Sequence, residues 1–146
     1  MRSRSVLLCL VLACGCSHRQ TGFRPLAVAG TTAEAEALVR AALVLDAAAD
    51  RQADTLYSPD AVVFANARQR FAHPRFAGVS YGGRVTVAAS AVNMMGSWAW
   101  AVVDYRWIGS QRSQAEVGRA TFILAKRQNG WRIVHVHSSQ LLPWDH

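Results

Sequence analysis

The hydrophobic pattern of this chain changes its period between the first and the second half. Apolar residues between Thr31 and Ala53 recur every three or four positions, which predicts a helix with one apolar face. Later segments are rich in β-branched and aromatic residues and are separated by Gly, Ser, Gln and Asn turns, which predicts strands. These segments span residues 84–95, 97–109, 116–127 and 131–139. A helix followed by antiparallel strands predicts the α+β class, with the helix packed on one face of a sheet.

The helical segment opens with Thr31 and Glu34 at the spacing of a capping box, in which each side chain bonds the backbone N–H of the other. Its apolar stripe consists of Leu38, Val39, Ala42, Leu43 and Ala49. Asp46 falls on this stripe, and Asp50 follows one turn later. A carboxylate on the buried face of a helix costs free energy unless something pairs with it. Asp46 is therefore a candidate functional residue.

Two segments connect this helix to the four strands. Residues 53–66 predict a short helix, a Ser-Pro-Asp turn and a first strand at Ala61–Ala65. Residues 66–83 have no hydrophobic period, which predicts a long loop.

The first 16 residues resemble a targeting signal. Arg2 and Arg4 precede an apolar run from Val6 to Ala13, which is far shorter than the roughly 20 residues of a membrane-spanning helix. The end of this run is similar to a bacterial lipobox, in which a cysteine is lipidated and becomes the new N-terminus after cleavage. We expect Cys14 to carry the lipid, with Cys16 as the alternative. An ordinary secretory signal is the other interpretation.

This interpretation divides the chain into a lipoprotein signal peptide (1–16), a tether (17–30) and one domain (31–146). We expect an exported protein that a lipid holds on a bacterial membrane, facing the periplasm. All three cysteines lie in the signal, so the domain has no thiol nucleophile and no disulfide. The net charge of +7 is spread along the chain without a dense basic run, which argues against nucleic-acid binding.

The chain resembles the nuclear transport factor 2-like superfamily, and within it the SnoaL-like group. The resemblance rests on "ADRQADTLYSPDAVVF" after the helix, on the strand "AWAVVDYRW", and on the final hairpin "GRATFILAKRQNGWRIVHVHSS". It covers roughly residues 32–140. It implies a curved antiparallel sheet wrapped around a long N-terminal helix, forming a cone with an internal pocket, and a homodimer formed through the sheet.

Two of the strands carry polar residues that could line such a pocket. On the last strand, Trp131, Ile133, His135 and His137 share one face by strict alternation. In the resembled family, this face looks into the cone. The sequence also allows either histidine simply to bond to the helix or the sheet.

On the strand at residues 97–109, one face carries two indoles and two charges, and the other face is apolar apart from a phenol. In the hub domain of a calmodulin-regulated kinase, a strand of similar pattern points its arginine into the pocket. This likeness implies that Asp104 and Arg106 lie inward, where Arg106 could bind a carboxylate. An ion pair of Arg106 with Asp104 or Asp46 is the structural alternative. The opposite face is then the candidate dimer surface; it consists of Ala99, Ala101, Val103, Tyr105 and Trp107, with Val134 and Val136.

The orientation of Arg119 depends on the turn at Asn129-Gly130, a strong hairpin signal. A two-residue loop places Phe122 and Leu124 on the histidine face and turns Arg119 away. A three-residue loop with a glycine bulge brings Arg119 to the histidines. Both alternatives remain open at this level.

The candidate pocket residues are Asp46, Tyr57, Trp98, Trp100, Asp104, Arg106, Arg119, His135 and His137. The two histidines could bind a metal, but no third ligand stands at a recognised spacing, so we expect no metal and no other cofactor. We favour a membrane-tethered domain that binds a small organic molecule, with an anionic one favoured by Arg106. A ketosteroid-isomerase or hydratase-type enzyme is the first alternative, with Asp46, Asp50 or Asp104 as general base and His137 or Tyr57 as polariser. A dimeric assembly module is the second.

Overall fold

The computed structural model describes residues 30–66, 68–70, 83–109 and 115–140. The expected signal peptide, nearly all of the tether and most of the expected loop at 66–83 lie outside the described residues. In chain order the elements are α1 (Thr32–Ala47), the 3-10 helix η1 (Arg51–Leu56), β1 (Tyr57–Ala65), β2 (Arg68–Arg70), β3 (Gly83–Met95), β4 (Trp98–Gly109), β5 (Ala115–Arg127) and β6 (Gly130–Gln140). Each of the four long strands matches its sequence prediction to within a residue or two at either end.

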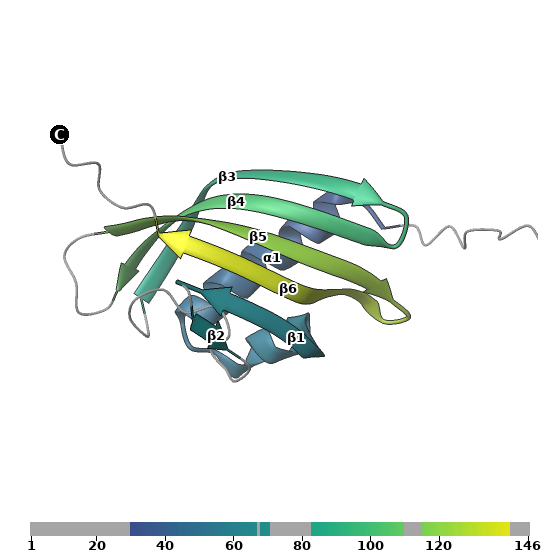
Figure 1. Cartoon of the computed structure of the whole chain (residues 1–146), viewed down its shortest axis with the longest axis horizontal. Coiled ribbons are helices and arrows are strands. Elements are labelled where there is room, and N and C mark those ends of the chain that lie inside the picture. The colour runs from purple at the N-terminus through teal and green to yellow at the C-terminus, as the bar shows by residue number, and fades with distance from the viewer. Residues whose placement is uncertain (1–29, 67, 71–82, 110–114, 141–146) are drawn as a thin grey trace, which may run out of the picture.

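The strands form one six-stranded sheet in the order β2-β1-β6-β5-β4-β3, and α1 crosses one face of it (Figure 1). The α+β class is confirmed. The sheet is mixed and not wholly antiparallel, because β1 pairs with β6 in parallel. β1 is also longer than predicted: it starts at Tyr57, so Ser58, Pro59 and Asp60 lie within the strand and not in a turn.

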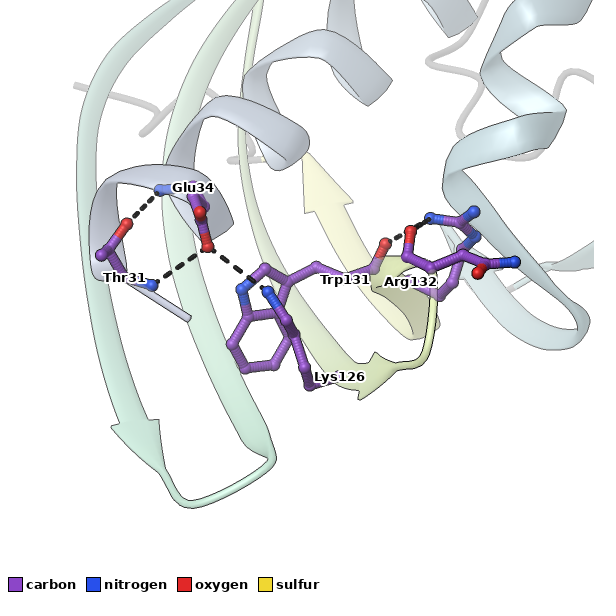
Figure 2. A network of polar contacts seen from close by, with 6 residues as sticks. Thr31, Glu34, Lys126, Trp131 and Arg132 are labelled. Atoms are coloured by element: carbon purple, nitrogen blue, oxygen red, sulfur yellow. Dashed lines mark hydrogen bonds and ion pairs between the residues drawn. The ribbon is translucent and has the colours of Figure 1, made fainter. Parts of the chain in front are cut away.

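The capping box at the start of α1 is present. The Thr31 hydroxyl accepts from Glu34 N at 3.1 Å, and the Glu34 carboxylate accepts from Thr31 N at 3.2 Å. The same carboxylate lies 3.4 Å from Lys126 Nζ on β5, as Figure 2 shows. These contacts lower the pKa of Glu34, the bond from the Thr31 backbone most of all. The cap therefore fixes both the first turn of the helix and its position against the β5–β6 hairpin.

The core lies between α1 and the face of the sheet that it covers, here called the inner face. From α1 it takes Ala35, Val39, Ala42, Leu43 and Ala47, and from β4 it takes Ala99, Ala101, Val103, Tyr105 and Trp107. The prediction that this face of β4 is a dimer surface is wrong. Val103 and Trp107 have no exposed surface, because they pack into the core beneath α1. The helix covers the apolar face of β4 because burying that face removes more apolar area from water than burying the charged face would.

A β-bulge in β6 separates its two histidines from the inner face. Leu124 pairs with Ile133, whereas the preceding residue, Ile123, pairs with His135. Val134 is therefore an extra residue in β6, and alternation restarts in the opposite phase after it. Trp131 and Ile133 lie inward, but so do Val136 and Ser138 instead of the histidines.

The pairing of β5 with β6 shows on which face Arg119 lies. Arg127 pairs with Gly130 and Lys126 with Trp131, so the turn consists of Gln128 and Asn129. Gly130 has a φ of +103°, a conformation that favours glycine. The loop has two residues, but the bulge then brings Arg119 to the histidine face. Neither alternative drawn from the turn alone is correct.

Candidate functional site

Asp46 is the one buried carboxylate among the described residues. It lies on the side of α1 that packs against the inner face. Its side chain is 1% exposed and follows the buried Ala42 and Leu43 along α1. The Tyr57 hydroxyl, from the start of β1, donates to Asp46 Oδ2 at 2.6 Å. Tyr57 is itself 3% exposed and belongs to the apolar core. The two residues that the sequence placed in the pocket from separate elements are thus in direct contact.

This pair has the chemistry of a small-molecule site in an apolar setting. A buried carboxylate must be hydrogen-bonded, because its desolvation is costly. A phenol that donates to it holds the carboxylate in one orientation. Such a pair can accept a hydrogen bond from a ligand, or exchange a proton with it, while surrounding apolar side chains provide contact area.

Asp50 does not share this site. Its carboxylate accepts from Gln52 N at 2.9 Å and caps η1, so it is used to begin that short helix.

Four candidate residues of β4 lie on the opposite, outer face of the sheet, away from α1. Trp98 is 45% and Trp100 is 39% exposed, and Arg106 is exposed as well. Asp104 also lies on the outer face, where it pairs with Arg119 of β5. The predicted inward orientation of Arg106 and Asp104 is wrong, because the apolar parity of β4 is the one that α1 covers.

The Asp104–Arg119 pair is bidentate, with Arg119 Nε at 2.6 Å and Nη2 at 2.9 Å from the two carboxylate oxygens. The hydrogen bond and the charge of Arg119 lower the pKa of Asp104. Both side chains are accessible to water, which screens this attraction. The pair balances charge on the outer face.

His135 and His137 also lie on the outer face, contrary to the prediction that they face the cone. His137 is exposed and pairs with Thr121, and His135 is partly covered and pairs with Ile123. The ring of His135 lies 6.0 Å from that of Phe64 on β1, at a tilt of 52°. The bulge at Val134 is the physical reason, since strict alternation would have placed both rings under α1.

A second polar group on the inner side was missed by sequence reasoning. Tyr105 and Ser138 are buried there, and a hydrogen bond joins their side chains. Burial raises the pKa of Tyr105 to about 12, and the charge of Glu116 adds to the increase. Gln140 Nε2 donates to Glu116 at 2.6 Å. The available signal was the single phenol, that of Tyr105, on the otherwise apolar face of β4.

Gly118 on β5 makes room for the Tyr105 ring. Any Cβ at Gly118 would overlap the Cζ and hydroxyl of Tyr105 on the neighbouring strand. Tyr105 therefore lies flat across β5, with its hydroxyl directed toward β6.

The described part of the chain contains no group of three His, Cys, Asp or Glu residues that could hold a metal. No helix in this described part is long and apolar enough to cross a membrane. An open groove between the end of α1 and the start of β3 is lined by Val44, Ala48, Gly83, Arg84, Val85, Thr86 and Ile108. Asp46 and Tyr57 do not line that groove.

Comparison with known proteins agrees with this architecture. The family model of the SnoaL-like domain matches residues 35–143, and the chain belongs to that family. None of the curated proteins compared with the chain matches it.

Solved structures show the same nuclear transport factor 2-like fold. A superfamily protein from Salmonella enterica is 22% identical with a TM-score of 0.60, over 79% of this chain and 96% of that one. A proposed ketosteroid isomerase from Shewanella frigidimarina is 15% identical, with a TM-score of 0.59 over 73% and 94% of the two chains. The CaMKII hub of S. rosetta is 20% identical, with a TM-score of 0.56 over 77% and 98%. At these identities the likeness shows the fold.

Proposed function

We propose that this chain is a small-molecule-binding domain whose site is built on Asp46 and Tyr57. The observation that carries the proposal is the 2.6 Å hydrogen bond between them, made by side chains that are 1% and 3% exposed. A core designed for stability alone does better with apolar residues of similar volume at such positions. Binding of a ligand to the carboxylate would explain why this position carries Asp46.

The ligand chemistry follows from which charges face inward. Arg106, the residue that favoured an anionic ligand, is exposed on the outer face. The described inner site offers a carboxylate and a phenol, which suit a neutral molecule with a hydrogen-bond donor or a weakly acidic C–H group. Apolar core residues such as Leu43 and Phe122 suit a ligand with a mainly apolar body.

A thermal-shift screen with a panel of small organic molecules tests this function. A ligand at a hundred times its Kd should stabilise the native chain by about 2.7 kcal/mol. Asp46→Asn should remove the ligand-induced shift. Asp104→Asn makes the same chemical change on the outer face and should leave the shift intact. Equal shifts in both variants would exclude Asp46 as the binding residue.

A second candidate function is proton transfer at a carbon next to a carbonyl group. It is favoured by the contact of a buried carboxylate with a phenol, and one structural neighbour is a proposed ketosteroid isomerase. Asp46 would act as general base, and Tyr57 would orient it. Removing a general base typically slows such a reaction 10²- to 10⁴-fold. Solvent deuterium exchange into a β,γ-unsaturated ketosteroid, followed by NMR, should therefore be lost in Asp46→Asn; an unchanged exchange rate would exclude this activity.

The lipid anchor belongs to the same proposal. A thioether-linked lipid on Cys14 would hold the domain on a bacterial membrane, on its periplasmic side. Cys14→Ser should then abolish incorporation of labelled palmitate and partition into the detergent phase. Incorporation that persists in Cys14→Ser and disappears in Cys16→Ser would move the lipid to Cys16. Incorporation that is absent from the unmodified chain would exclude the anchor.

Pairing of two copies through the outer face is the remaining part of the proposal. Exposed apolar side chains gather on this face, among them Trp100, Ile108 and Val117. The Asp104–Arg119 pair at its centre offers opposite charges, which a two-fold arrangement can share between copies. The likeness to a kinase hub supports assembly as a use of this fold.

A further inference from the structure

The turn between β3 and β4 carries the most exposed large apolar side chain among the described residues. Met95 is 65% exposed, and Trp98, its direct cross-strand neighbour, is 45% exposed. Both lie on the outer face, and together with the intervening Gly96 and Ser97 they form what we call the β3–β4 tip. Gly96 has a φ of +61°, and a Cβ built on it would meet open space.

This tip lies at the end of the domain where the preceding chain enters. Gly30 lies against the Trp131 indole, because a Cβ at Gly30 would overlap its ring. Lys126 pairs with Trp131 across the hairpin, and its backbone N donates to Ser97 O in the β3–β4 turn at 2.7 Å. Its ammonium group reaches Glu34 in the first turn of α1. Figure 1 accordingly shows the start of α1 beside the turn that joins β3 to β4.

One basic residue, Arg132, lies on the outer face at the same end of the sheet as the tip. Across the outer face, Trp98 pairs with Ala125, which pairs in turn with Arg132. Asp104 is the one acidic residue among the described side chains that alternate onto the outer face of β3, β4, β5 and β6, and Arg119 already pairs with it. Arg84 and Arg106 lie on the same face, but at the opposite end of β3 and β4 from the tip.

We propose that the β3–β4 tip rests on an anionic lipid bilayer, with Met95 and Trp98 in the interfacial layer and Arg132 near the headgroups. The proposal rests on the lipid anchor proposed above. Tryptophan favours the membrane–water interface, where its ring is partly apolar and its N–H stays hydrated. Exposed apolar area and basic residues both strengthen binding to anionic lipid.

The anchor makes this contact geometrically available. Gly30 follows Cys14 by 16 positions, so the two are separated by at most roughly 55 Å even in a fully extended chain. The tether joins the domain at Gly30, so the end of the domain that contains Gly30 stays within reach of the bilayer. The tip is at that end, whereas the groove between α1 and β3 is at the other end of the helix.

Quenching of tryptophan fluorescence by brominated acyl chains tests the contact. The full chain, purified from bacterial membranes, would be reconstituted into vesicles of brominated phosphatidylcholine and phosphatidylglycerol. Trp98→Phe should lose at least about half of the quenching seen in the unmodified chain. Trp100→Phe is the matched control: it lies on the same strand and face but two residues farther from the turn, and it should retain the quenching.

Co-flotation with the vesicles reports on the anchor separately. A chain that floats but is quenched equally with and without Trp98 keeps its anchor and overturns the contact. Quenching through Trp98 that persists in Cys14→Ser supports the contact and shows that it does not need a lipid on Cys14. Protection of Trp98 from aqueous acrylamide in the absence of lipid, together with a doubled particle size, would mean that a second copy covers the tip and would overturn the proposal.

Discussion

The hydroxyl of Tyr57 donates a 2.6 Å hydrogen bond to the Asp46 carboxylate, and this contact joins the last turn of α1 to the first residue of β1. Tyr57→Phe should cost about 1 to 3 kcal/mol of unfolding free energy, the range for leaving a buried hydrogen-bond partner unsatisfied. In the Asp46→Asn background the same change should cost a different amount, because the two side chains are in contact. Urea denaturation of the four chains of this cycle measures the coupling. Strictly additive effects would mean that the contact contributes nothing to stability.

Adjacent residues of β4 should respond oppositely to the same substitution. Val103 is fully buried beneath α1, so Val103→Glu should cost several kcal/mol and unfold most of the chain. Val102 lies on the outer face, so Val102→Glu should leave the fold intact and separate the two copies of a dimer. Circular dichroism and light scattering measure the two effects. A folded, monomeric Val103→Glu chain beside a dimeric Val102→Glu chain would restore the orientation expected from the sequence.

Tyr105 should titrate at unusually high pH. Burial raises its pKa from 10.0 to about 12. A raised pKa in the folded state means that the stabilisation is complete below about pH 10 and is lost as the pH rises toward 12. Absorbance of tyrosinate should show a late step whose amplitude decreases in Tyr105→Phe. An unchanged amplitude in Tyr105→Phe would assign the late step to another tyrosine.

The capping box should stabilise the domain and respond to acid. Thr31→Ala should cost about 0.5 to 2 kcal/mol, the usual range for a lost N-cap. The pKa of Glu34 is lowered, so its contribution is present above the ordinary carboxyl range near 4.5 and disappears as the pH falls through the folded-state value. Thermal unfolding of the unmodified chain and of Glu34→Gln should therefore converge in strong acid. Curves that stay equally separated at every pH would contradict this role.

Much of the fold could be predicted from the sequence because its signals are local. The capping box needs only Thr31 and Glu34, and the long strands follow from their β-branched and aromatic runs. The inward position of Asp46 follows from the helical period alone, and the burial of its side chain agrees with it.

The orientations of β4 and of the end of β6 could not be predicted, because each depends on a partner. The residues of β4 alternate strictly between its two faces, so the inner face is decided only by which one the helix covers. The bulge at Val134 leaves no mark in the residues of β6, yet it turns His135 and His137 outward. Comparison with a related strand gave the wrong face for Arg106, since likeness of pattern does not fix phase.

Amide chemical-shift mapping by NMR tests most directly whether the ligand site is the inner pair. A ligand from the thermal-shift screen would be titrated into the isotope-labelled chain. The account predicts the largest shift changes at Asp46 and Tyr57 on the inner side, with little change at Arg106 and His137. Changes concentrated at Arg106 and His137, with Asp46 and Tyr57 unaffected, would contradict it and place ligand binding on the outer face of the sheet.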